Sequence, residues 1–332
     1  MTDFILQLHI TGNCNLRCRH CYIDEHCRDM SYADVRRVVG QYEALIKRLE
    51  RRSGQPIRAH IHFTGGEPLL HPEIRRILRF FFRKRRHFVY GVMSNGTRLE
   101  PRTLALLRRL RLIAFQVSLD GDEAAHDAMR GRGNFQAVLG ALDTLAAHGI
   151  PARVSFTAHK ENYTLFPQVA ATCRAHRVSS LWSDRYVPFG ADNGLSPLTA
   201  EDMPAYAAVL QTERDNPQNA ACGLTVQNHR ALQLLCGGEH VYYCKAAESM
   251  ITVDEHGNIM PCRRLPLVCG NVADTTLADV YDGHETFIRL RQHRVTGKCV
   301  HCAHAARCRG GERCFTHAVG GDDEAPDPCC PL

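Results

Sequence analysis

Short apolar runs with a period of two recur along the first half of the chain, and longer amphipathic stretches separate them. The runs cover residues 4–10, 58–64, 88–94, 112–118, 152–158 and 180–187. Such alternation is typical of half-buried β-strands, and strands that alternate with helices form parallel sheets. Six βα units predict an α/β fold, a partial (β/α)6 TIM-type barrel that lacks the eight units of a closed one.

The stretch after Ser31 shows the helical spacing most clearly. Ser31 and Asp34 resemble a capping box, so a helix is expected to begin directly after Ser31. Its apolar residues share one stripe, as in a helix with one buried face: Val35, Val38, Val39, Tyr42, Leu45, Ile46 and Leu49.

The pattern changes after residue 190, which predicts three domains. Residues 1–190 form the barrel, residues 191–235 a helical bridge, and residues 236–332 a domain rich in cysteine, glycine and histidine. Within the last domain, residues 250–262 read as a hairpin that turns at His256 and Gly257.

Sixteen cysteines among 332 residues need an explanation. The chain shows no secretion signal and no apolar run of membrane-spanning length, so we expect a cytoplasmic protein. Because the cytosol keeps thiols reduced, binding of metal ions or iron–sulfur clusters is favoured over disulfides.

Cys14, Cys18 and Cys21 form a CxxxCxxC pattern directly after the first predicted strand. Three thiolates are one short of a full set for a 4Fe–4S cluster, so one iron would keep an open position. The alternative is a structural zinc site, which needs four ligands and would have to recruit His20 or His26.

The segment around this triplet, ITGNCNLRCRHCYID, closely resembles the radical SAM superfamily, and further motifs follow the next predicted strands in the expected order. Each motif alone has a simpler interpretation as a turn, a loop or a surface residue. The resemblance implies that GGEP holds the amino group of S-adenosylmethionine (SAM), and that SNGT, SLDG and HDAMRG contact its ribose and carboxylate. The residues concerned are Gly65, Gly66, Glu67, Pro68, Ser94, Asn95, Ser118, Asp120 and Arg130.

The resemblance also implies the chemistry. Reductive cleavage of SAM at a 4Fe–4S cluster yields a 5′-deoxyadenosyl radical, which removes hydrogen from the substrate. The catalytic residues that act on the substrate stay unknown from sequence.

A second group of cysteines lies in the last domain and resembles the SPASM extension of radical SAM enzymes. The extension implies two auxiliary 4Fe–4S clusters, and therefore about three clusters in reconstituted protein. The implied ligands are Cys236, Cys244 and Cys262 for the first, and Cys299, Cys302, Cys308 and either Cys329 or Cys330 for the second.

The chain departs from the SPASM pattern at one position. The family's next cysteine normally follows Cys308 after three residues, but Glu312 stands there and Cys314 comes two positions later. Either Cys314 reaches in from a longer loop, or a carboxylate, water or substrate takes that place. Zinc is the alternative here, with His301, His304 and His317 as further ligands.

Four cysteines fit neither motif, and we expect them to be buried structural thiols: Cys27, Cys173, Cys222 and Cys269.

Most SPASM relatives modify peptides or proteins, so maturation of a ribosomally made precursor peptide is the leading hypothesis. Sulfatase maturation is weakened because Arg263 follows Cys262, where those relatives have a basic aspartate. Tetrapyrrole chemistry of the haem pathway is a further alternative, since those enzymes share a similar CNLRCRHCY stretch. A non-enzymatic iron–sulfur electron carrier would show a broken SAM motif, and none is broken.

The net charge of +6 is modest and partly local, with five basic residues between Arg79 and Arg86. This patch is either a solvated helix face or a site for an acidic partner. Nothing indicates nucleic acid or membrane partners. Since one strand already precedes Cys14, we expect no leader-binding domain and instead a separate peptide-recognition protein, together with an electron donor such as flavodoxin or ferredoxin.

Overall fold

The computed structural model describes residues 2–23, 28–190, 193–236 and 242–332. The chain divides into two compact units, each discontinuous in sequence. Unit 1 comprises Met1–Asn15, Ile23–Phe115 and Lys245–His293, and unit 2 comprises Leu16–Tyr22, Gln116–Cys244 and Arg294–Leu332. The sequence-based boundaries near residues 190 and 235 stay a prediction.

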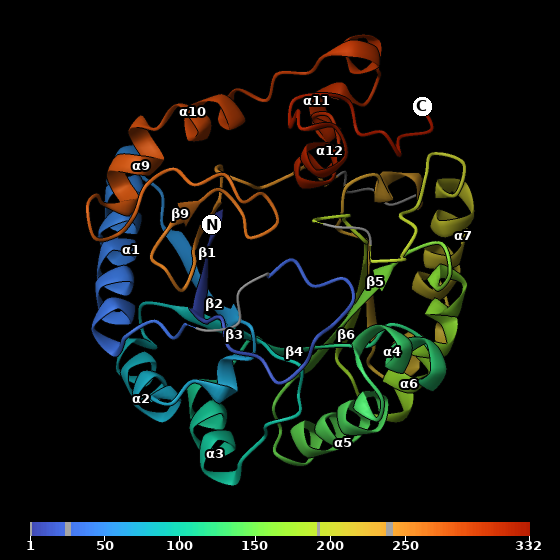
Figure 1. The fold of residues 1–332 in the computed structure, drawn as a ribbon, viewed down its shortest axis with the longest axis horizontal. Coiled ribbons are helices and arrows are strands. Elements are labelled where there is room, and N and C mark those ends of the chain that lie inside the picture. Colours follow the sequence, from blue (N-terminus) through green and yellow to red (C-terminus); the bar gives the residue numbers. More distant parts are fainter. Residues whose placement is uncertain (1, 24–27, 191–192, 237–241) are drawn as a thin grey trace. The chain divides into compact units, whose positions relative to one another are not determined.

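Unit 1 is built on strands in the order β3-β2-β1-β8-β9 (Figure 1). All neighbours are parallel except β8 and β9, which pair antiparallel as the predicted hairpin. Its elements are β1 (Thr2–Thr11), α1 (Tyr32–Ser53), β2 (Ile57–Gly65), η1 (Pro68–Leu70), α2 (Ile74–Lys84), β3 (Val89–Met93), α3 (Pro101–Leu110), β8 (Met250–Val253), β9 (Ile259–Met260), α9 (Leu277–Gly283) and α10 (Glu285–Gln292).

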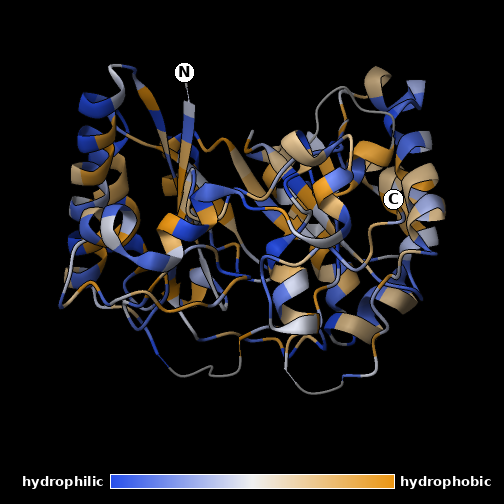
Figure 2. Ribbon diagram, turned by 90° about the horizontal axis from the view of Figure 1, so that it is seen from above, coloured by the Kyte–Doolittle hydropathy of each residue, from blue (hydrophilic) through white to orange (hydrophobic). Residues whose placement is uncertain are grey.

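The two faces of β1 differ in chemistry, because successive side chains of a strand point to opposite sides. Alternate residues from Phe4 to Ile10 are buried and apolar, and Phe4 packs on Tyr42 of α1 and Tyr281 of α9. The Tyr42 hydroxyl donates to the Phe4 carbonyl at 2.7 Å. On the opposite face, Gln7 and His9 are buried and polar. The mixed polar and apolar composition of the helices, which lets each present an apolar face to the core, is visible in Figure 2.

Unit 2 contains parallel β5, β6 and β7, with β4 beginning at the unit boundary. Its elements are β4 (Ala114–Ser118), α4 (Glu123–Arg130), α5 (Asn134–Ala147), β5 (Ala152–Ala158), η2 (Tyr163–Leu165), α6 (Phe166–Ala175), β6 (Ser180–Arg185), α7 (Met203–Arg214), α8 (Pro217–Ala221), β7 (Thr225–Gln227), η3 (Gln233–Cys236), η4 (Gly297–His301), α11 (Ala305–Cys308) and α12 (Arg313–Gly320).

All six predicted strands are present as β1 to β6, and a helix follows each of them along the chain. The helix after Ser31 is confirmed too, with the Ser31 hydroxyl accepting from the Asp34 amide at 3.1 Å. The sequence did not indicate that β8 pairs in parallel with β1, nor that β7 follows α8. No helix in the described part of the chain is long and apolar enough to cross a membrane.

Candidate active site

In unit 1, a buried carboxylate joins the loops that follow β2 and β3. Glu67 is completely buried, and its carboxylate accepts hydrogen bonds from the Leu69 amide at 2.9 Å and the Asn95 amide at 2.7 Å. The Ser94 hydroxyl lies 2.9 Å from both carboxylate oxygens. Burial raises the pKa of Glu67 to about 7, although these donors favour the charged form. Glu67 therefore holds the GGEP and SNGT motifs against each other.

The glycines before Glu67 are required by the backbone of the cysteine loop. A Cβ atom on Gly65 would lie 2.0 Å from the Thr11 carbonyl oxygen, and one on Gly66 would lie 2.3 Å from that of Asn13. The amides of Gly66 and Glu67 donate to these same two oxygens at 2.8 and 2.7 Å. Only glycine permits this approach, so GGEP shapes the segment that leads to Cys14.

Cys14 lies beside the SNGT motif. The side-chain amide of Asn95 is 3.8 Å from the Cys14 sulfur and donates to the Asn15 side chain at 3.0 Å. Unit 1 thus gathers Cys14, Glu67, Ser94 and Asn95, which the sequence assigned to the cluster and to SAM.

In unit 2, Arg130 at the end of α4 lies beside the other half of the cysteine motif. It donates to the Asp120 carboxylate, and its other nitrogens lie 3.9 Å from the Cys18 sulfur and 3.2 Å from His20 Nε2. Burial acts against the Arg130 cation, but Asp120 and Cys18 more than offset it, so the pKa of Arg130 is raised. A permanent cation therefore stands next to the Cys18 sulfur.

The sequence did not single out His20 as a partner of Arg130. Burial and the neighbouring guanidinium lower the pKa of His20 to about 3, which keeps the imidazole neutral and able to accept from Arg130. Its position between Cys18 and Cys21 is the only signal that pointed to it.

The predicted residues of the SLDG motif fix the end of β4. Asp120 accepts from the Thr157 amide at 2.8 Å, and the Ser118 hydroxyl lies 3.2 Å from that of Ser155 on β5. Burial opposes ionisation of Asp120, but Arg130 overcomes it, so the pKa of Asp120 is lowered.

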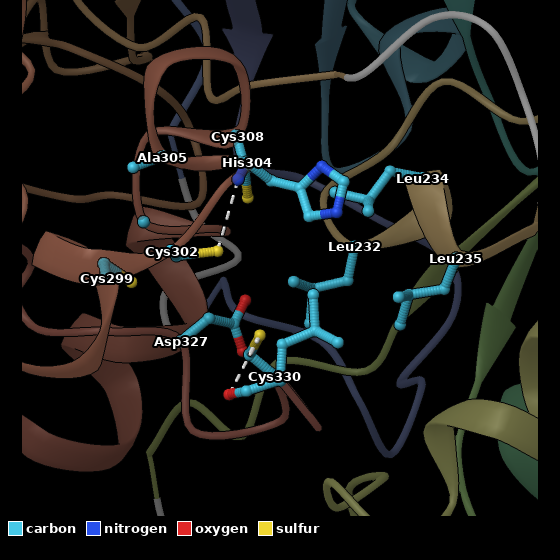
Figure 3. A pocket seen from close by; sticks show the side chains of 12 residues that line it. Leu232, Leu234, Leu235, Cys299, Cys302, His304, Ala305, Cys308, Asp327 and Cys330 are labelled. Carbon is cyan, nitrogen blue, oxygen red and sulfur yellow. Dashed lines mark hydrogen bonds between the residues drawn. The ribbon is translucent and has the colours of Figure 1, made fainter.

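Four cysteines of unit 2 line one pocket, shown in Figure 3: Cys299, Cys302, Cys308 and Cys330. Apolar side chains from η3 and its neighbour, Leu232, Leu234 and Leu235, line the same pocket. An adjoining pocket of about 390 Å³ shares Cys299, Cys302 and Cys330. Four thiols from segments separated in sequence therefore face a common space.

Two family models match the chain. The radical SAM superfamily model matches residues 8–169, and the SPASM model, described as an iron–sulfur cluster-binding domain, matches residues 244–303. The chain is a radical SAM enzyme with a SPASM domain.

Its relatives match along nearly the whole chain. "AdoMet-dependent heme synthase" of Nitratidesulfovibrio vulgaris is 24% identical over 98% of this chain and 91% of its own length. "Mycofactocin maturase MftC" of Mycobacterium ulcerans is 28% identical over 98% of this chain and 87% of its own. SuiB of Streptococcus suis bound to S-adenosylmethionine shares the fold, with a TM-score of 0.79 at 16% identity, covering 100% of this chain and 78% of that one. The fold is thus the predicted α/β partial barrel followed by a SPASM domain.

The two domains imply 4Fe–4S clusters and SAM as cofactors, and the residues present fit them. Near the N-terminus, the CxxxCxxC spacing of three cysteines suits a cluster with one open iron, which Cys14 of unit 1 and Cys18 and Cys21 of unit 2 would hold. In the pocket of Figure 3, four thiols that face one space suit a fully ligated cluster. When bound, these groups supply the radical chemistry; the protein binds SAM, orients it and excludes water.

Cys329 and Cys314 lie outside this group of four. The Cys329 thiol is buried and donates to the Leu198 carbonyl at 2.9 Å, and burial raises its pKa to about 11. Cys314 donates to the Glu312 carboxylate at 3.3 Å, and both residues are buried. Neither cysteine lines the two pockets described above. Of the two candidates at the end of the chain, the geometry favours Cys330 as the ligand.

The ligands implied for the other auxiliary cluster are only partly described. Cys262 lies in unit 1 with its sulfur 3.9 Å from the Gln7 side chain, and half-buried Cys244 lies in unit 2. The side chain of Cys236 lies outside the described residues, as do Cys27 and His26. Among the residues that are described, no three His, Cys, Asp or Glu side chains form a group suited to a single metal ion.

The expectation of buried thiols holds for two of the remaining cysteines. Cys173 and Cys269 are buried, and burial raises the pKa of Cys269 to about 11. For Cys222 the expectation is wrong, because it is exposed directly after the short helix α8.

Proposed function

We propose that this radical SAM enzyme modifies a peptide or protein, with maturation of a ribosomally made precursor peptide as its role. The observation that carries the proposal is the similarity to peptide maturases along 98% of the chain, which spans both the radical SAM and the SPASM regions. SuiB, whose fold the chain shares, has also been solved with its precursor peptide SuiA.

A second candidate is chemistry on a tetrapyrrole. It is favoured by the similarity to heme synthases, which also extends over 98% of the chain, and by the CNLRCRHCY segment. Sulfatase maturation is less well supported, because the guanidinium of Arg263 contacts the Met93 sulfur where a basic carboxylate would be needed.

The candidates are separated by supplying both substrates to reduced, anaerobically reconstituted enzyme. One reaction contains the peptide encoded by a short reading frame beside the gene, and the other an iron porphyrin with propionate side chains. We expect a mass change in the peptide, with 5′-deoxyadenosine formed in step, and none with the Cys18→Ala variant. Conversion of the porphyrin with an unchanged peptide would contradict the proposal and establish the second candidate.

We also propose that a separate acidic protein delivers the peptide, and that an electron donor such as flavodoxin or ferredoxin reduces the enzyme. Residues 74–112 contain twelve Lys and Arg but only one acidic residue, Glu100, so this segment carries +11 while the whole chain carries +6. Within the described structure, only Lys84 and Arg76 of these form ion pairs, with Glu43 and Glu73. The segment therefore supports docking of an acidic surface.

The most concentrated charge lies at the carboxyl ends of α2 and α3. Arg85 and Arg109 both lie over the ring of Phe82, at 3.8 and 4.6 Å, so two like charges share one aromatic side chain. These helix ends lead into the amino ends of β3 and β4, whereas Cys14 follows the carboxyl end of β1. Five residues of strand separate such edges by about 17 Å. The basic helix ends therefore lie at the opposite strand ends from Cys14. This favours a partner that delivers the peptide over a partner that must itself contact the cluster.

Reversing the charge of this surface should weaken the partner's binding. We expect Arg85→Glu with Arg109→Glu to lower the affinity for an acidic recognition protein encoded beside the gene at least tenfold at low salt. High salt should reduce the difference, since exposed charges are screened. The matched control is Arg36→Glu with Arg51→Glu, which makes the same charge change on exposed positions of α1. Equal effects of the two pairs in titration calorimetry would refute the assignment.

A further inference from the structure

Asp327 fixes the turn that carries the two adjacent cysteines at positions 329 and 330. Its carboxylate accepts from the Cys329 amide at 3.0 Å, and its carbonyl accepts from the Cys330 amide at 3.0 Å. Neighbouring side chains in this turn point in different directions: the Cys329 thiol donates to the Leu198 carbonyl, and Cys330 lines the cysteine pocket. Which of the two thiols faces the pocket therefore depends on the conformation that Asp327 imposes.

Asp327 is itself anchored to the barrel by Arg185, the last residue of β6. The guanidinium donates to both oxygens of the Asp327 carboxylate, at 2.9 and 2.7 Å, and to Glu312 at 3.0 Å. Arg185 and Asp327 are each 1% exposed. Bidentate pairs of this kind fix geometry as well as charge. Burial alone would oppose the cation, but the two carboxylates keep the pKa of Arg185 above its ordinary value.

The same carboxylate holds the loop that follows Cys308. The Glu312 amide donates to Asp327 at 2.9 Å, and the Asp327 amide donates to the Gly310 carbonyl at 3.1 Å. Gly311 adopts a φ of +90°, and a Cβ atom there would lie 2.4 Å from the Asp327 side chain. One buried residue therefore determines the spacing between the loop after Cys308 and the turn that carries Cys330.

We propose that Asp327, held by Arg185, is the positioning residue that directs Cys330 into the auxiliary-cluster site. Asp327 also lines the pocket, but both of its carboxylate oxygens accept hydrogen bonds from Arg185 and from backbone amides. It therefore acts through the backbone of the turn and not as a ligand. Glu312, which stands where the SPASM pattern has a cysteine, joins this ion-pair network through its contact with Arg185. The inference concerns cluster assembly and does not depend on which substrate the enzyme modifies.

The test is iron content in anaerobically reconstituted protein. We expect Asp327→Ala to lose about four irons per chain, the content of one 4Fe–4S cluster, and Arg185→Met to do the same. Cys330→Ser should show an equal loss, and Asp327→Ala combined with Cys330→Ser should lose no more than either alone. Asp322→Asn, which changes an exposed aspartate of the same tail, should keep all its iron.

Formation of 5′-deoxyadenosine without substrate is the control for correct folding, because it reports the SAM-binding cluster. It should persist in each variant. The electron paramagnetic resonance signal of the auxiliary cluster should disappear together with the iron. Unchanged iron and an unchanged signal in Asp327→Ala would overturn the proposal. A loss in the combined variant larger than that of Cys330→Ser would also overturn it, as would loss of SAM cleavage in both Asp327→Ala and Arg185→Met, because either shows a general structural role.

Discussion

Replacing Cys18 with alanine is expected to abolish 5′-deoxyadenosine formation while the SPASM domain keeps its iron. Cys18 is one of three thiols available to the cluster that binds SAM, and Arg130 stands 3.9 Å from its sulfur. The remaining Cys14 and Cys21 provide too few ligands for that cluster. The Cys299, Cys302, Cys308 and Cys330 set is unaltered, so about one 4Fe–4S cluster's iron should be lost and the rest retained.

Cys222→Ala is the matched control, because it removes an exposed thiol of the same unit that belongs to neither motif. It should leave both iron content and SAM cleavage unchanged. Product formation by Cys18→Ala at the rate of the unaltered enzyme would show that the active site has been misassigned.

Replacing Cys330 with serine is expected to remove about four irons, whereas the same change at Cys329 should remove none. The two residues are adjacent and chemically identical, but only Cys330 lines the pocket with three other cysteines. The Cys329 thiol donates to the Leu198 carbonyl, and a serine hydroxyl can make the same hydrogen bond. Iron and acid-labile sulfide are measured after anaerobic reconstitution.

Each of these two variants is the control for the other, since both make the same chemical change at adjacent positions. Loss of iron from Cys329→Ser with full retention in Cys330→Ser would reverse the assignment. Zinc in place of iron in both variants and in the unaltered protein would contradict the cluster altogether and favour the zinc alternative, for which His301 and His304 line the adjoining pocket.

Local patterns predicted the strands and the hairpin because their information lies within a few residues. Alternation marked β1 to β6, and Gly257, with a φ of +83°, supplied the turn between β8 and β9. The pairing of β8 with β1 was not predicted, because Gln7 and Thr252 are 245 positions apart and nothing local specifies the partner strand. Likewise, nothing local indicated that glycines 65 and 66 admit the backbone of the cysteine loop.

The candidate site was predictable to the level of residue type but not of orientation. Spacing identified the cysteines, yet it could not choose between Cys329 and Cys330, since the choice depends on Asp327 and on its distant partner Arg185. An arginine at the end of a strand and an aspartate in a polar tail carry no shared sequence signal. Their pairing across 142 positions emerges only when the chain is folded.

Because β1 pairs in parallel with β8, β1 cannot complete its pairing until β8 has been synthesised. A ribosome that adds 5–20 residues per second needs on the order of tens of seconds to make the 245 residues between Gln7 and Thr252. Throughout that interval one edge of β1 lacks its final neighbour, and an unpaired edge can recruit a strand from another chain. During this time the nascent protein is prone to aggregate, and a chaperone that covers the open edge of β1 would reduce that risk.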